Sequence, residues 1–215
     1  MGRSASSPRR LGRGFFLADA REVAQALIGK LLVRDDGRAA RLVEVEAYMG
    51  QKDPGSHAYR GPTPRAAIMF GPPGRLYVYF SYGMHWCANI VCGREGTASA
   101  VLLRAAQPIA GIDLMRAARQ DGKRPRPLPV RDLCRGPGRL TQAFSITGAD
   151  NGLDLLPAGS ALLWLADDGT GPGGEVAATA RVGLGAGRGP ELPWRYLLLG
   201  SPWVSQGPAP VVEAM

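Results

Sequence analysis

The sequence has few of the residues that bind metals or form disulfides. Its 215 residues include only three cysteines and two histidines. The cysteines, Cys87, Cys92 and Cys134, are odd in number and form no Cys-x-x-Cys pair. So few ligands exclude a disulfide framework and a structural zinc site. We therefore expect a protein of a reducing compartment that uses no metal and no other cofactor.

Long apolar runs are also missing. No stretch is long and apolar enough to cross a bilayer. The N-terminal segment is basic and rich in serine but lacks the apolar core of a secretory signal. Hydrophobic residues make up 45% of the chain and charged residues 20%, as in ordinary globular proteins. We expect a water-soluble monomer with no membrane contact.

Lysine is scarce, but positive charge is not. Lysine occurs only at Lys30, Lys52 and Lys123, yet Lys+Arg total 26 against Asp+Glu 18, a formal net charge of +8. This excess is typical of proteins that bind polyanions. The 30 glycines and 18 prolines indicate a GC-rich genome. Such a genome explains why arginine is used in place of lysine better than it explains why basic residues outnumber acidic ones.

Helices and strands are interspersed without a βαβ repeat or an internal period. Asp19 to Glu22 resembles a capping box, and the amphipathic helix that follows is predicted to end at Gly29. Further helices are predicted at 109–120 and 138–144, and strands at 30–34, 40–48, 100–105, 162–166, 176–182 and 194–199. The pattern favours an α+β fold with a mostly antiparallel, curved sheet and surrounding helices.

The length of the chain is typical of one domain. We expect this domain to span residues 15–207, preceded by a flexible basic arm over residues 1–14 and followed by a C-terminal tail over residues 208–215.

The segment LYVYFSYGMHWCAN, residues 76–89, predicts a protruding β-hairpin. Its first half alternates Leu, Val and Phe with two tyrosines and a serine, the period of a strand with one apolar and one polar face. Tyr82-Gly83-Met84 interrupts this alternation, and a strand-like run resumes at Trp86. We therefore expect Tyr82 and Met84 to be exposed at the tip.

The strand ending in VEVEAY places two carboxylates on one face. Glu44, Glu46 and Tyr48 project together because side chains alternate with a period of two. This face is either a solvated outer surface or the wall of a pocket. His57 follows on a glycine-rich loop, so Glu46, Tyr48, His57 and Tyr79 are candidates to converge on one pocket. The pattern alone does not choose between Glu44 and Glu46 as the reactive carboxylate.

Several long motifs resemble the alkyladenine (3-methyladenine) DNA glycosylase family. VEVEAY, GSHAYRG, LYVYFSYGMHWCANIV, VLLRAAQP, RVGLG and GSPWVS occur in order between Phe15 and Ser205. Members hydrolyse the N-glycosidic bond of alkylated or deaminated purines in duplex DNA, of the 3-methyladenine, hypoxanthine and ethenoadenine class, and so start base excision repair. The resemblance implies double-stranded DNA with damaged purines as the partner, no lyase activity, and a cytoplasmic, nucleoid-associated protein if the source is bacterial.

The resemblance also implies roles for individual residues. Glu46 matches the general base that activates water, and Tyr82 matches the aromatic residue that replaces the flipped nucleotide, with Met84 pressing on the neighbouring base step. Further matches are the base-pocket residues and a phosphate-binding arginine: Tyr48, His57, Tyr79, Asn89, Leu102 and Arg104. Asn89 would clash with the exocyclic amine of guanine. His85 departs from the pattern, because some members have an aromatic residue there.

Two other functions fit parts of the sequence. A non-catalytic module that binds damaged DNA on the same fold would use the positive charge and the hairpin equally well. Glu46 argues against it, since a carboxylate beside the DNA backbone lowers affinity. An RNA-directed enzyme would use aromatic platforms for unpaired bases. The hairpin argues against that reading, because intercalation is needed only to open a stacked duplex.

Overall fold

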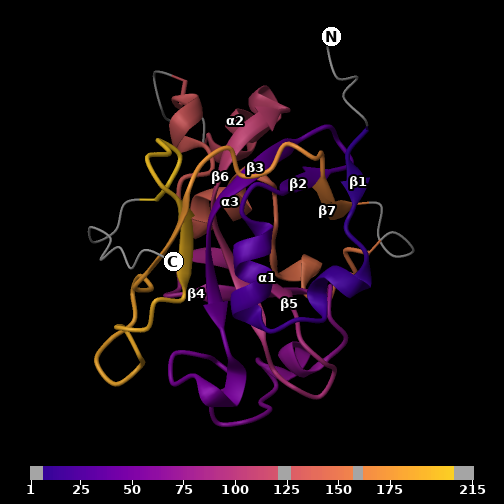
Figure 1. Ribbon diagram of the computed structural model, residues 1–215. Helices are drawn as coiled ribbons and strands as arrows, with labels where there is room; N and C mark the ends of the chain where they lie inside the picture. Colours follow the sequence, from indigo (N-terminus) through magenta and orange to yellow (C-terminus); the bar gives the residue numbers. More distant parts are fainter. Residues whose placement is uncertain (1–6, 121–126, 157–161, 206–215) are drawn as a thin grey trace.

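The computed structural model describes residues 7–120, 127–156 and 162–205 (Figure 1). Within them one nine-stranded sheet, in which every strand pair is antiparallel, curls around helix α1. The predicted α+β class with an antiparallel sheet is therefore confirmed. No helix in this part of the chain has the length and apolar character needed to cross a membrane.

The elements lie close to their predicted positions. The strands are β1 (Arg9–Arg10), β2 (Leu31–Arg34), β3 (Ala39–Tyr48), β4 (Leu76–Ser81), β5 (His85–Val91), β6 (Ala100–Ala110), β7 (Leu163–Asp167), β8 (Val176–Thr179) and β9 (Arg195–Leu198). The helices are α1 (Ala20–Leu27), α2 (Ile112–Arg119) and α3 (Pro137–Ala143). The largest differences are that β6 continues past its predicted end to Ala110, so that α2 begins at Ile112 and not at the predicted residue 109, and that β8 ends before Arg181.

Strand β3 is the centre of the sheet. The strand order is β1-β7-β2-β3-β6-β5-β4, and β8 pairs with β9, which in turn pairs with the second half of β3. Register shifts on either side of Glu44 show β-bulges against β6. Glu44 and Glu46 are completely buried, because arginine side chains of β6 and β9 and the segments that carry Val182 and Ser205 cover this face of β3. The interpretation of this face as a solvated outer surface is wrong.

Helix α1 begins and ends as its sequence predicts. The Asp19 carboxylate accepts hydrogen bonds from the backbone N–H groups of Arg21 and Glu22. Gly29 has a φ of +88°, and a Cβ there would lie 2.6 Å from the backbone of Pro172, so a side chain would be both strained and crowded. The helix buries its apolar face in the core that it shares with β3.

The sheet begins before residue 15. Arg9 and Arg10 pair with the end of β7, and the Arg10 guanidinium lies 3.9 Å from the ring centroid of Trp164. Leu11 is buried in the main core. Arg9, Arg10 and Leu11 are therefore packed against the sheet, whereas the first six residues of the predicted arm and the predicted tail at 208–215 lie outside the described residues.

The predicted hairpin is present as β4 and β5. Tyr82 and Gly83 both have positive φ, as the central residues of a type I′ turn do, and the Met84 N–H donates to the carbonyl of Ser81 at 2.9 Å. Tyr82 is 79% exposed and Met84 70%, which confirms the exposed tip. The prediction that β4 has one polar and one apolar face was wrong in part, because Tyr77 on the predicted polar face is buried and Phe80 on the predicted apolar face is 46% exposed.

Candidate active site

A cavity of about 440 Å³ lies between β3, the β4–β5 hairpin and the segment after Arg181. Its volume is within the range of small-molecule sites. The lining combines one carboxylate with aromatic rings, three arginines and small or apolar groups: Glu46, Tyr48, Gly55, Ser56, His57, Arg65, Met69, Tyr77, Tyr79, Phe80, Ser81, Tyr82, His85, Cys87, Asn89, Leu102, Arg104, Pro137, Val182, Gly183, Leu184 and Arg188.

The fold brings most of the predicted site residues together in this cavity. All of them except Met84 line it: Glu46, Tyr48, His57, Tyr79, Tyr82, Asn89, Leu102 and Arg104. They come from β3, β4, β5, β6, the hairpin tip and the loop after β3. Met84 lies instead at the exposed tip. The predicted convergence is present, and the chemical role of each residue stays a prediction.

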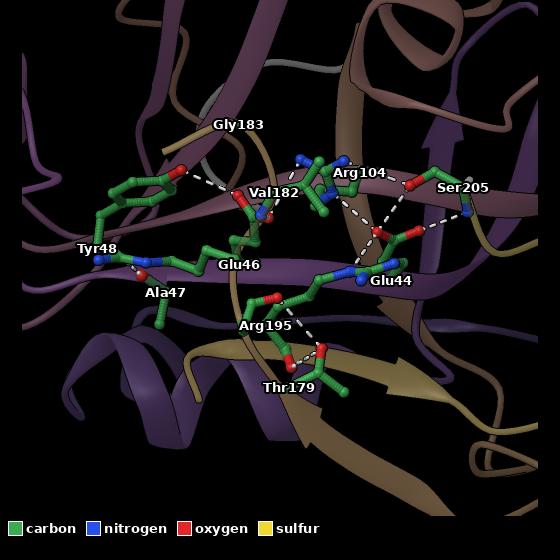
Figure 2. A network of polar contacts seen from close by, with 12 residues as sticks. Glu44, Glu46, Ala47, Tyr48, Arg104, Thr179, Val182, Gly183, Arg195 and Ser205 are labelled. Atoms are coloured by element: carbon green, nitrogen blue, oxygen red, sulfur yellow. Dashed lines mark hydrogen bonds and ion pairs between the residues drawn. The ribbon is translucent and has the colours of Figure 1, made fainter. Parts of the chain in front are cut away.

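Glu46 is held by donors on both carboxylate oxygens. Tyr48 donates its hydroxyl to Oε2 at 2.9 Å, and the backbone N–H of Val182 donates to Oε1 at 2.8 Å. Nη1 of Arg104 lies 3.2 Å from the same Oε1. A carboxylate has about four acceptor positions, so one remains for a further donor such as water. Figure 2 shows Tyr48 and Val182 approaching Glu46.

Glu44 has a different environment from Glu46. Its oxygens accept from the N–H and the hydroxyl of Ser205, at 2.6 and 2.8 Å, and from Nε of Arg104 and Arg195, both at 2.8 Å. Glu44 is absent from the cavity lining. Burial opposes ionisation of Glu44, but Arg104 and Arg195 outweigh it and hold its pKa below the ordinary value. The structure thus separates the two carboxylates, because only Glu46 faces the cavity.

Arg104 joins the two carboxylates. Its side chain is 7% exposed, with Nε bound to Glu44 and Nη1 beside Glu46. Burial alone would lower the pKa of Arg104, but Glu46 and Glu44 raise it above its ordinary value. The guanidinium is therefore a fixed cation at the base of the cavity. Its predicted contact with a DNA phosphate stays a prediction.

Aromatic rings form the walls of the cavity. Nδ1 of His57 is 2.9 Å from the hydroxyl of Tyr77, and the His57 ring meets the ring of Tyr79 edge to face at 4.5 Å between centroids. Burial, followed by the charges of Arg65 and Arg188, lowers the pKa of His57 to about 4. His57 is therefore a neutral hydrogen-bonding group at pH 7. Burial also raises the pKa of Tyr79, so its hydroxyl stays protonated.

A buried ion pair supports one wall from outside. The Arg181 guanidinium binds both carboxylate oxygens of Asp53, at 2.6 and 2.8 Å, and neither side chain is exposed. The same guanidinium lies 4.7 Å from the ring centroid of Tyr48. Since Arg181 precedes Val182, this pair anchors the residue whose N–H holds Glu46.

A second, basic cavity adjoins the first. It measures about 420 Å³ and shares Arg104 and Pro137 with the larger cavity. Four arginines and one carboxylate are among its lining residues: Arg104, Arg131, Asp132, Arg135, Gly136, Pro137, Arg139 and Ser205. The excess of arginine makes this region suited to an anion.

Comparison with known proteins identifies the family. A family model described as methylpurine-DNA glycosylase matches residues 14–202. The chain belongs to this family. Methylpurine-DNA glycosylases are DNA repair enzymes for alkylated bases, and the resemblance found in the motifs is thereby confirmed.

Relatives of the same family cover nearly the whole chain. A Burkholderia lata protein is 52% identical over 195 residues, 91% of this chain and 90% of that protein. A Leifsonia xyli protein is 50% identical, covering 90% and 91%, and a Frankia casuarinae protein is 49% identical, covering 93% of both chains. All three carry the provisional name 3-methyladenine DNA glycosylase.

Sequence reasoning missed several residues of this glycosylase site. Asp53 and Arg181 were not predicted, because an ion pair between residues so far apart in sequence leaves no local pattern. The backbone N–H of Val182 was missed for the same reason. The motif RVGLG, which begins at Arg181, was a signal for this segment, but it indicated only the family.

Proposed function

We propose that the protein is a monofunctional DNA glycosylase that flips alkylated or deaminated purines out of duplex DNA and hydrolyses their N-glycosidic bond with a water activated by Glu46. The observation that carries this proposal is the buried Glu46 carboxylate facing an aromatic-lined cavity. A module that only binds damaged DNA has no use for this arrangement, because a carboxylate near the backbone weakens binding.

In the proposed reaction the attacking water donates its proton to Glu46 while its oxygen forms a bond to C1′ of the deoxyribose. The bond between C1′ and the purine nitrogen breaks, and the base leaves with the electron pair. A cationic methylated purine leaves as a neutral molecule, and the proton on Glu46 passes to solvent. A neutral base such as hypoxanthine takes up a proton from solvent as it leaves, which balances the proton that Glu46 returns to solvent. The carboxylate also stabilises the positive charge that develops on the sugar in an oxocarbenium-like transition state.

Tyr48, His57 and Tyr79 are proposed to hold the extruded purine. Stacking on aromatic faces is worth about 1–3 kcal/mol per base and is tolerant of different bases. Asn89 donates its amide hydrogen to the carbonyl of Tyr77 at 3.1 Å, which fixes the amide in the cavity wall. A fixed amide supports the proposed exclusion of guanine, and Leu102 supplies an apolar contact beside it.

The hairpin tip is proposed to take the place of the flipped nucleotide. The Tyr82 ring is exposed, lines the mouth of the cavity, and has its hydroxyl 3.5 Å from the carbonyl oxygen of Gly183. An inserted ring offsets an unstacking cost of a few kcal/mol. Met84 is exposed on the other side of Gly83 and is proposed to press on the adjacent base step.

The basic cavity is proposed to face the DNA backbone. It adjoins the Glu46 cavity, so an arginine cluster there would contact phosphates close to the flipped nucleotide. No lyase step is proposed, because the residues that line the Glu46 cavity in the described structure include no lysine to form a Schiff base.

The test is base release under single-turnover conditions from two duplexes, one with a single hypoxanthine and one alkylated. Glu46→Gln should bind both but release base about 10² to 10⁴ times more slowly than the wild type, the range for a positioned general base. Glu22→Gln, the same change at an exposed position on α1, is the control and should match the wild type. Tight binding without release by the wild type would instead support a binding module.

A further inference from the structure

Glu44 is held in place by four hydrogen bonds. Its Oε1 accepts from Nε of Arg104, Nε of Arg195 and the hydroxyl of Ser205, and its Oε2 accepts from the Ser205 N–H. It is fully buried and does not line the Glu46 cavity. Glu44 therefore cannot replace Glu46 in the reaction. It is linked to Glu46 through Arg104, which contacts both carboxylates.

The Arg104 guanidinium contacts both carboxylates through different nitrogen atoms. Nε donates to Glu44 at 2.8 Å, Nη2 lies 3.3 Å from the hydroxyl oxygen of Ser205, and Nη1 lies 3.2 Å from Glu46. The contact with Glu44 is the shorter of the two carboxylate contacts. Figure 2 shows Arg104 between the carboxylates, with Ser205 beyond Glu44. Only one edge of the guanidinium is thus left for Glu46.

An arginine without a second acidic partner binds a carboxylate through two parallel N–H···O bonds. If Glu44 were neutral, Arg104 would be attracted to Glu46 alone. A bidentate contact between Arg104 and Glu46 would occupy the remaining acceptor position of Glu46 and compete with the attacking water.

We propose that Glu44 is a positioning residue that holds Arg104 in a single contact with Glu46, so that the catalytic carboxylate keeps one acceptor position for water. This inference rests on the proposed function of Glu46. Ser205 shares the role, because its hydroxyl donates to Glu44 and lies beside Arg104. Its N–H donates to Glu44 as well, which ties the segment after β9 to the active site.

The test compares Glu44→Gln with the wild type in single-turnover release of hypoxanthine and in binding to the same duplex. The variant should bind DNA normally but release base about 10- to 100-fold more slowly, as expected for a misplaced reacting group. Asp168→Asn is the matched control, since it also removes a carboxylate that is ion-paired with an arginine of β3, Arg41, at 2.6 Å. It should leave the rate unchanged.

A double-mutant cycle separates positioning from a purely structural role. Lysine cannot span two carboxylates as a guanidinium does. In an Arg104→Lys background, Glu44→Gln should therefore cause no further loss of rate, because residues that act through one another are not additive. An equally large loss in both backgrounds would overturn the inference.

Ser205→Ala keeps every charge, so it provides the test if Glu44→Gln does not fold. It should slow release by less than Glu44→Gln, and only when Arg104 is present. Full activity of both Glu44→Gln and Ser205→Ala would overturn the inference but leave the proposed function intact. A wild-type protein that releases no base from any substrate would overturn both.

Discussion

Asp53 and Arg181 form a bidentate ion pair, with Nη1 of Arg181 2.6 Å from Oδ2 of Asp53 and Nη2 2.8 Å from Oδ1. Neither side chain is exposed to solvent. Asp53 also accepts the backbone N–H groups of Met49 and Gly55, so the pair holds the loop after β3 against the segment that carries Val182. These two segments supply His57 and the N–H that binds Glu46. The ion pair thus connects global stability with the geometry of the active site.

Asp53→Asn should destabilise the protein by about 3–5 kcal/mol, because it leaves a buried guanidinium without a counter-charge. Urea denaturation followed by circular dichroism measures this change. Asp113→Asn, which removes the exposed partner of Arg116, should have little effect. Equal stability of the two variants would contradict a structural role for the buried pair.

His57 should make stability depend on pH between about 4 and 6.5. Its pKa is lowered from 6.5 to about 4 in the folded state, so as pH falls the unfolded chain takes up the proton first. The free energy of unfolding should therefore fall as pH drops through this window and stay constant above it. The ring is partly exposed, which keeps the effect modest. His57→Gln should flatten this part of the profile, and an unchanged slope would rule out His57 as its source.

Tyr82→Ala should weaken retention of the flipped nucleotide, which the fluorescence of a reporter base beside the lesion measures. Tyr82 has a φ of +49°, a conformation that costs roughly 1–2 kcal/mol for a residue other than glycine. Tyr82→Gly should therefore lose retention equally but gain stability. If Tyr82→Ala retained the flipped state as well as the wild type, the hairpin would not be the wedge.

Arg131→Ala and Arg139→Ala should each reduce the dependence of log K on log salt by about 0.9, the contribution of one phosphate contact. Arg104→Lys is the control, because Arg104 lines the same cavity but is paired with Glu44 and Glu46, and the substitution keeps the charge, so the slope should stay unchanged. If Arg131→Ala and Arg139→Ala also keep the wild-type slope, the basic cavity does not contact the DNA backbone.

Much of the fold was predictable because its signals are local. The cap at Asp19, the glycine stop at Gly29 and the alternation of β4 each depend on residues within a few positions of one another. The tip of the hairpin was predictable for the same reason, since Tyr82-Gly83 must turn the chain. The predicted ends of β6 and β8 were less accurate, because partner strands and neighbouring loops set where pairing stops.

The list of cavity residues was predictable only through the motifs. Alternation along β3 showed that Glu44 and Glu46 share a face, but it allowed that face to be either solvated or buried. Residues far away in sequence bury it, namely Arg104 on β6, Arg195 on β9 and the segments that carry Val182 and Ser205. The choice between the carboxylates likewise depends on distant residues, because Arg195 and Ser205 hold Glu44 outside the cavity while Glu46 lines it.

Residue type and local spacing were therefore sufficient for the class of fold and the exposed hairpin tip, and the resemblance of the longer motifs was sufficient for the family. The tertiary structure decided which carboxylate faces the cavity, that Arg104 contacts both Glu44 and Glu46, and that the ion pair of Asp53 and Arg181 supports the site. The physical reason is that hydrogen bonds and ion pairs between distant segments depend on burial and register, which no short stretch of sequence encodes.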